Sequence, residues 1–140
     1  MAKRNKNINK KQKIKRKLKR ELSAVKTLKY KTTFKDIKKY FKLINSHVFD
    51  GKLSPFNDVQ LVNKPRSYIG QVVVHDKERK GTRSFTLEML KSYSNKKEFV
   101  DTLGHEMIHL FQMQNMGDTG NHNDVFYSFR PKLNAIGLDI

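Results

Sequence analysis

Apolar residues recur at helical spacing shortly after the first 30 residues of the chain. The steps of three and four residues that align side chains on one face of an α-helix are followed by Phe34, Ile37, Phe41, Ile44 and Val48. Thr33 and Asp36 stand three residues apart at the start of this run, as in a capping box that begins a helix. The pattern therefore predicts an amphipathic helix that begins near Thr33 and ends before Gly51.

Three short segments in the middle of the chain are rich in β-branched and aromatic residues, which favour strands. These segments are Val59–Val62, Tyr68–His75 and Ser84–Leu87. The charged segment Asp76–Thr82, which contains a glycine, separates the second from the third. A hairpin is therefore expected between the last two strands.

A second helix is predicted after Asn95, where Glu98 completes another capping box. Apolar residues continue at helical spacing as far as about Gly117, and the polar loop Gly117–Asn121 follows. A last helix is indicated by Val125, Phe126, Phe129 and Leu133. The order of one helix, three strands and two helices predicts a small α+β domain.

The first 20 residues hold 11 Lys or Arg and no acidic residue. This composition favours disorder, because like charges repel and little apolar surface can be buried. An apolar stripe nevertheless follows helical spacing, at Ile14, Leu18, Leu22 and Val25, and would favour a helix if a partner screened the lysines. The chain is therefore divided into a basic, disordered or conditionally helical arm at residues 1–32 and a folded domain at residues 33–140.

The formal net charge of +17 is concentrated in the first third of the chain. Residues 1–42 hold 18 Lys or Arg and two acidic residues, whereas residues 43–140 have a net charge of only +1. Lys and Arg bind nucleic acids by neutralising phosphates and releasing counterions, so the arm is expected to bind nucleic acid. An arm that only keeps the protein in solution is the alternative.

Composition also excludes several classes of protein. The 140 residues include no cysteine, which excludes disulfides and thiolate metal sites. No apolar run is long enough for a signal peptide or a membrane span, so we expect an intracellular protein without a membrane partner. The abundance of Lys and Asn would suit a phage protein, which would act in the cytoplasm of its host.

The second predicted helix contains an HExxH motif, His105-Glu106-Met107-Ile108-His109. Residues four apart lie on one face of a helix, so both imidazoles can bind a single Zn²⁺ ion. Glu106 is rotated by about 100° from His105, which directs its carboxylate beside the metal, where it can act as general base. Gln112 is expected on the same face, either as a hydrogen-bond partner of a ligand or as a solvated residue.

A catalytic zinc site needs a third protein ligand and an open position for water. The metzincin continuation is absent, because Gln112 and Asn115 stand where Gly and His are required, and no Glu follows Glu106. His122 is favoured because imidazole suits zinc and the preceding loop can bring it back over the motif. Asp124 is the main rival, and the other candidates are Asp118 and Asp139. The two histidines that precede the motif, His47 and His75, are expected to be structural.

The segments around these residues resemble the SprT-like (Spartan-type) metallopeptidases. Four parts of the chain carry the resemblance, namely Ile44–Pro55, Lys96–Leu103, His105–Leu110 and Gly120–Phe126. It implies a minimal zincin-like domain in which His105, His109 and His122 bind zinc and Glu106 is the catalytic residue. The chain departs from the family pattern in two respects. Asn121 and Asn123 flank His122 where the family has glycines, and the cysteine zinc ribbon of many members is missing.

The motif, the basic arm and the resemblance together predict a zinc-dependent endopeptidase that acts on DNA-associated proteins. Two alternatives stay open. The first is a nucleic-acid-binding protein with a structural or vestigial zinc site, and the second is an ordinary peptidase with an incidental basic tail. The open coordination position and the free Glu106 favour a peptidase over a structural site. The sequence does not decide whether Tyr68 or Tyr127 stabilises an oxyanion.

Overall fold

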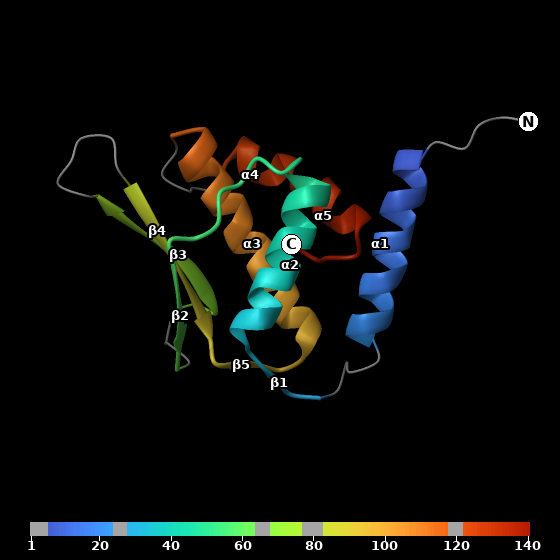
Figure 1. Ribbon diagram of the computed structural model, residues 1–140, viewed down its shortest axis with the longest axis horizontal. Helices are drawn as coiled ribbons and strands as arrows, with labels where there is room; N and C mark the ends of the chain where they lie inside the picture. The colour runs from blue at the N-terminus through green and yellow to red at the C-terminus, as the bar shows by residue number, and fades with distance from the viewer. Residues whose placement is uncertain (1–5, 24–27, 64–67, 77–82, 118–121) are drawn as a thin grey trace, which may run out of the picture.

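Helices and strands are mixed along the chain in the computed structural model, which describes residues 6–23, 28–63, 68–76, 83–117 and 122–140 (Figure 1). The helices are α1 (Lys6–Ser23), α2 (Phe34–Val48), α3 (Lys96–Asn115), α4 (Asp124–Ser128) and α5 (Arg130–Ala135). The strands are β1 (Tyr30–Lys31), β2 (Asp58–Val62), β3 (Gly70–Asp76), β4 (Arg83–Leu90) and β5 (Ser92–Tyr93). This arrangement confirms the α+β class predicted from the sequence.

The two long helices of the predicted domain begin at the predicted caps. The Thr33 hydroxyl accepts a hydrogen bond from the Asp36 amide at 3.1 Å, and the Asn95 side chain accepts one from the Glu98 amide at 2.8 Å. These bonds satisfy amides that have no partner inside the helix, which fixes the first turn of α2 and of α3. The helices then pack against each other through fully buried residues, among them Tyr40, Ile44, Phe99 and Leu103.

The three predicted strands form one sheet in the order β2-β4-β3. β3 and β4 are antiparallel, as expected for a hairpin, with Gly70 opposite Met89, whereas β2 runs parallel to β4. Most of the predicted hairpin loop, residues 77–82, lies outside the described residues. Among the described strands β3 pairs only with β4, so one edge of β3 is free. The sheet lies on one side of α2 and α3, and α1 lies on the other (Figure 1).

Two features of the fold were not predicted. β1 and β5 form a second sheet of two residues each, in which Tyr30 pairs with Tyr93. The single last helix is in fact two short helices, because α4 ends at Ser128 and Pro131 lies in the first turn of α5. Proline lacks a backbone N–H and is favoured in a first turn, so α5 begins as a new helix.

The basic N-terminal segment forms a helix, whereas its composition favours disorder. Within residues 6–23 it is helix α1, and Leu18 and Leu22 are only 1% and 4% exposed in the hydrophobic core. The Tyr40 hydroxyl of α2 also donates a hydrogen bond of 2.6 Å to the Glu21 carboxylate. The apolar stripe therefore finds its partner within the same chain, and Val25 lies outside the described residues. The domain boundary at residues 32/33 stays a prediction, although α1 packs on the body that follows it.

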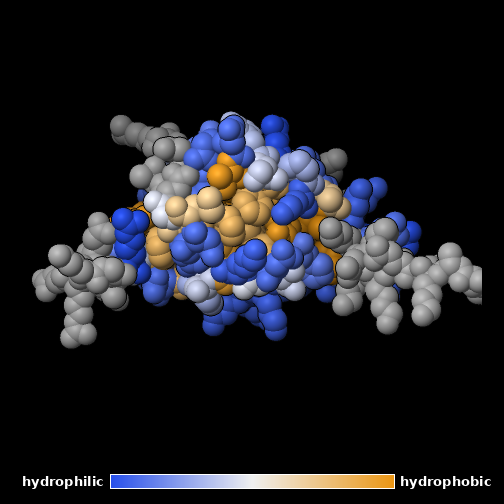
Figure 2. Space-filling view, turned by 90° about the horizontal axis from the view of Figure 1, so that it is seen from above, coloured by the Kyte–Doolittle hydropathy of each residue, from blue (hydrophilic) through white to orange (hydrophobic). Residues whose placement is uncertain are grey.

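Hydrophilic side chains occupy the rim of the face seen in Figure 2. Seen from above, they surround a hydrophobic centre on the face that carries α4 and the C-terminal end of α3 (Figure 2). None of the helices in the described part of the chain is long and apolar enough to cross a membrane.

Candidate metal centre

Helix α3 positions the first two histidines of the site. His105 and His109 are one helical turn apart, and their Nε2 atoms are 3.2 Å from each other. The opposite face of α3 is anchored in the core by buried residues that include Leu103, Met107 and Leu110. Because these apolar contacts fix the rotation of the helix, both imidazoles are directed away from the core toward one point.

The third histidine comes from the segment that precedes α4. The Nε2 atom of His122 lies 3.2 Å from Nε2 of His109, and the ligand atoms of His105, His109 and His122 all lie within 4.8 Å of one another. The structure thus brings together the three residues that the sequence predicted. Asp124 and Asp139 do not belong to this cluster, and Asp118 lies outside the described residues. Asp139 instead pairs with Lys97.

The donor set fits a divalent transition metal. Two imidazole nitrogens that bind one Zn²⁺ tetrahedrally at about 2.05 Å would lie roughly 3.3 Å apart. Burial, together with neighbouring His109 and His122, lowers the pKa of His105 from 6.5 to about 4. Burial likewise lowers the pKa of His109. Both rings are therefore neutral near pH 7, which leaves a nitrogen lone pair on each for a metal ion.

Gln112 was expected either to contact a ligand or to be solvated, and it is fully buried. Its Oε1 lies 3.0 Å from Nδ1 of His109, and its Nε2 donates a hydrogen bond of 2.9 Å to Asn123 Oδ1. Sequence reasoning missed Asn123, which was noted only as a departure from the family pattern. Its position directly before the predicted last helix was the available signal, because asparagine is a common N-cap residue.

Glu106 faces the same region as the three imidazoles but is nearly enclosed, with 5% of its surface exposed. Burial disfavours the charged carboxylate and raises its pKa from 4.5 to about 8. The side chain lies against strand β3, where a Cβ on Gly70 would be 3.5 Å from Cγ of Glu106. A divalent cation held by the histidines would favour the ionised form of this carboxylate.

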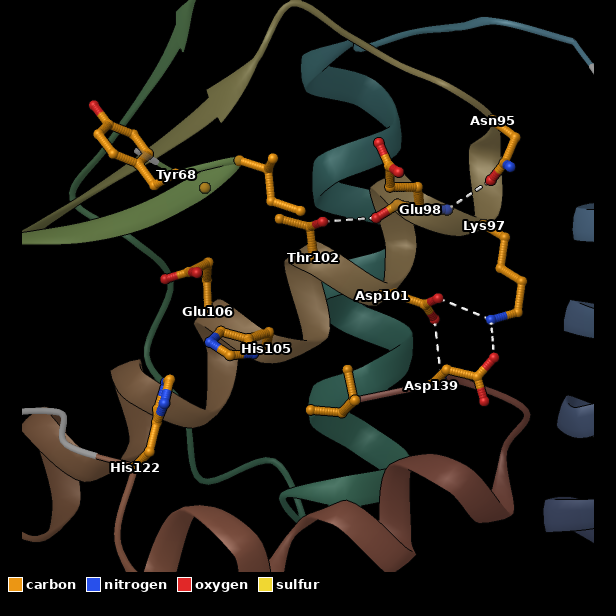
Figure 3. Close-up of a pocket in the computed structure, with 13 residues that line it drawn as sticks. Tyr68, Asn95, Lys97, Glu98, Asp101, Thr102, His105, Glu106, His122 and Asp139 are labelled. Carbon is orange, nitrogen blue, oxygen red and sulfur yellow. Dashed lines mark hydrogen bonds and ion pairs between the residues drawn. The ribbon is translucent and has the colours of Figure 1, made fainter. Parts of the chain in front are cut away.

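A pocket of about 680 Å³ opens beside these residues. His105, Glu106 and His122 lie toward one end of it, and Lys97, Asp101 and Asp139 lie toward the other (Figure 3). Lys97 forms ion pairs with both aspartates, so part of the charge at that end is neutralised. A smaller groove of about 280 Å³ is lined by residues of both α3 and β3, among them Gly70, Gln71, His105, Glu106 and His109.

The two remaining histidines have no part in this cluster. Nδ1 of His47 lies 2.8 Å from the Leu43 carbonyl oxygen of the same helix, and His75 is exposed on β3. In the described part of the chain, the only group of three or more His, Cys, Asp or Glu with metal-binding geometry is His105, His109 and His122.

The HExxH helix and a third histidine from the following segment form a site that could hold a metal ion, an arrangement typical of metallopeptidases. The chain belongs to the SprT-like family, whose model matches residues 37–138. This match confirms the resemblance and includes all four predicted site residues. Comparison with curated proteins and with solved structures gives no significant match.

Proposed function

We propose that this protein is a zinc-dependent endopeptidase in which His105, His109 and His122 bind Zn²⁺ and Glu106 is the general base. The observation that carries the proposal is the position of Glu106. Its carboxyl group is buried beside three converging imidazoles and lines the same open pocket as two of them. A purely structural site would use a fourth protein ligand and would not need this carboxyl group.

The chemistry follows from the donor set and from Glu106. When bound, Zn²⁺ would supply a Lewis acid that acidifies water and polarises a carbonyl group. Glu106 would accept a proton from the attacking water and then give it to the leaving amine. In the metal-free protein burial raises the pKa of Glu106 to about 8, and a divalent cation on the histidines would favour the ionised form that accepts this proton.

Strand β3 supports a peptide as the substrate. Among the described strands one edge of β3 has no partner, and Gly70 and Gln71 line the same groove as His105 and Glu106. An extended peptide can pair with the backbone groups of such an edge, as in other cases of strand addition. Pairing here would place a substrate carbonyl close to the histidine cluster.

Activity would be tested with the wild type and Glu106→Gln, each loaded with zinc, on an unfolded protein substrate. Asp50→Asn is the matched control, because it also removes one carboxylate, is exposed and lies outside the site. We expect Glu106→Gln to retain zinc and to lose cleavage by at least about 100-fold, whereas Asp50→Asn should cleave normally. Equal cleavage by Glu106→Gln and the wild type would contradict the proposed mechanism.

We also propose that the basic face of α1 binds nucleic acid and brings the peptidase to DNA-associated proteins. The burial of Leu18 and Leu22 fixes the helix, while Lys13, Arg16 and Arg20 are exposed on the face away from the core. Four further lysines, Lys29, Lys31, Lys39 and Lys96, line a pocket of about 440 Å³ near the end of α1. Glu21 is the single acidic residue among those that line it.

Nucleic-acid binding would be tested by charge removal rather than by deletion. Deletion of residues 1–30 would remove Leu18 and Leu22 from the core together with the charges. The substitutions Lys13→Gln, Arg16→Gln and Arg20→Gln keep both leucines, and Lys52→Gln, Lys91→Gln and Arg130→Gln are a control with the same loss of charge. If each α1 residue contacts a phosphate, the magnitude of the negative slope of log K against log salt should fall by roughly 2.7 for duplex DNA. An unchanged affinity and slope would discard this role, and DNA-independent cleavage of all substrates would favour an ordinary peptidase.

A further inference from the structure

The buried amide of Gln112 connects two parts of the candidate metal centre that are separated in sequence. On one side its Oε1 is 3.0 Å from Nδ1 of His109, which lies one turn earlier on α3. On the other side its Nε2 is 2.9 Å from Oδ1 of Asn123, which directly follows His122. One side chain therefore contacts one candidate ligand and the chain neighbour of another.

The direction of each hydrogen bond follows from the start of helix α4. Asn123 is the N-cap of that helix, and its Oδ1 accepts the backbone N–H of Phe126 at 3.2 Å. Because this backbone N–H can only donate, the atom of Asn123 that it meets must be the oxygen. The group of Gln112 that faces the same oxygen must then be its NH₂, so its oxygen faces His109.

The direction of these hydrogen bonds determines which nitrogen of His109 carries the proton. A carbonyl oxygen can only accept, so Nδ1 of His109 must donate to Gln112. In a neutral imidazole the other nitrogen, Nε2, then keeps its lone pair. Nε2 of His109 is the atom that lies 3.2 Å from Nε2 of both His105 and His122. The series of hydrogen bonds from Phe126 through Asn123 and Gln112 therefore leaves Nε2 of His109 free to bind a metal.

We propose that Gln112 and Asn123 are a pair of positioning residues for the metal centre. Gln112 holds His109 in its metal-binding tautomer, and the bond to Asn123 ties the segment that carries His122 to α3. The inference deepens the proposed metal site and rests on it. It also gives a role to Asn123, which replaces a glycine of the family pattern, because only a side chain at this position can reach Gln112.

The test uses Gln112→Leu, which keeps the size of the side chain and removes the hydrogen bonds to His109 and Asn123. Gln114→Leu is the matched control, because Gln114 is also on α3 and also makes two hydrogen bonds, to the amide and the carbonyl of Ser54. If Gln112 contributed only to folding stability, both variants would leave the tautomer of His109 and the affinity for zinc unchanged. Asn123→Ser is a second variant that keeps a helix cap but is too short to reach Gln112. Asn123→Asp keeps an oxygen that can accept from both the Gln112 amide and the Phe126 backbone N–H, and it serves as the conservative replacement.

Two measurements report on the pair without peptidase activity. The first is the tautomer of His109 in the metal-free protein, observed in a long-range ¹H–¹⁵N NMR spectrum of the imidazoles. The second is the affinity for Zn²⁺, measured by competition with a chromophoric chelator. Loss of an outer hydrogen-bond partner of a ligand typically weakens metal binding 10–100-fold.

We expect the wild type, Gln114→Leu and Asn123→Asp to hold the Nδ1-protonated tautomer of His109 and to bind zinc with similar affinity. Gln112→Leu should lose this tautomer and bind zinc 10–100-fold more weakly, and Asn123→Ser should also weaken binding. The inference is overturned if Gln112→Leu retains the tautomer and binds zinc as tightly as Gln114→Leu. If Gln112→Leu does not fold, unchanged binding by Asn123→Ser overturns it equally. A wild type with the expected tautomer and no cleavage would contradict only the proposed peptidase function.

Discussion

Gly70 on strand β3 lies in direct contact with Thr102 on helix α3. A Cβ at position 70 would be 2.7 Å from Cγ2 of Thr102, a distance that real Cβ atoms essentially never show. Thr102 cannot turn away without a loss, because its hydroxyl donates a hydrogen bond of 2.7 Å to the Glu98 carbonyl oxygen. The absence of a side chain at Gly70 therefore allows the edge strand to approach the HExxH helix beside Glu106.

The close approach predicts that Gly70→Ala destabilises the protein by about 1–3 kcal/mol, because the strand and the helix must separate. Thr102→Ser removes Cγ2 and keeps the hydroxyl, so it should recover much of this loss when combined with Gly70→Ala. The free energies of unfolding of the wild type, both single variants and the double variant, measured in urea, form the cycle that checks this compensation. If the two changes in the free energy of unfolding are strictly additive, the contact with Thr102 does not limit how closely β3 approaches α3.

The elements that could be predicted from the sequence are those specified by neighbouring residues. Thr33 and Asn95 cap α2 and α3 through side chains three residues from their partners, and this spacing is visible in the sequence. The same holds for the HExxH motif, because both of its histidines lie on one helix. The third ligand needed a different argument, since His122 lies after a loop. The sequence excludes a downstream Glu and the metzincin histidine but leaves Asp124 as a rival of His122.

The features that were missed depend on contacts between distant residues. β2 pairs in parallel with β4, and neither strand carries a local signal for that choice. Tyr30 pairs with Tyr93 in strands of two residues, which is too short for a recognisable pattern. The positive charge of α1 suggested disorder, whereas the burial of Leu18 is decided by the shape of the core it meets. Gln112 was predicted only in part for the same reason. The sequence shows its spacing from His109, but it does not show the hydrogen bond to Asn123.

Helix α1 should contribute to stability through Leu18. This side chain is 1% exposed, and Leu→Ala substitutions at buried positions typically cost about 2–5 kcal/mol. We therefore expect Leu18→Ala to lower the free energy of unfolding by an amount in this range. The control is Lys19→Ala, at the next, exposed position of the same helix, which should change it by less than about 0.5 kcal/mol. Equal effects of the two substitutions would mean that α1 is not docked on the core in solution.

The buried carboxyl group of Glu106 makes the stability of the metal-free protein depend on pH. Burial raises the pKa of Glu106 from 4.5 to about 8, so between these values the folded state holds a proton that the unfolded state has released. The free energy of unfolding should therefore fall as pH rises through this window. His105 has the opposite effect between about pH 4 and 6.5, because its pKa is lowered in the folded state.

Between pH 6.5 and pH 8 a comparison with Glu106→Gln isolates Glu106, since the small remaining contribution of the histidines is the same in both proteins. The wild type should lose roughly 2 kcal/mol of stability over this range relative to Glu106→Gln, which cannot titrate. Urea unfolding of both proteins in the presence of a chelator measures the difference. Parallel pH profiles would mean that Glu106 has an ordinary pKa in the metal-free protein.

The choice between His122 and Asp124 as third ligand can be settled by the effect of zinc on stability. A ligand that binds only the folded state stabilises it by about 2.7 kcal/mol when its free concentration is 100 times its Kd. Zinc should therefore raise the melting temperature of the wild type and of Asp124→Ala, because Asp124 is exposed and lies outside the cluster. His122→Ala should lose most of this increase.

His75→Ala is the control for the loss of a histidine, because His75 is exposed and does not join the cluster. Its melting temperature should rise with zinc as much as that of the wild type. A full increase in His122→Ala combined with none in Asp124→Ala would identify the aspartate as the ligand. Since Nε2 of His122 lies 3.2 Å from Nε2 of His109, close to the separation of two imidazole ligands of one Zn²⁺ ion, little reorganisation is needed for the histidine to bind. An aspartate ligand would instead require the first turn of α4 to move toward α3.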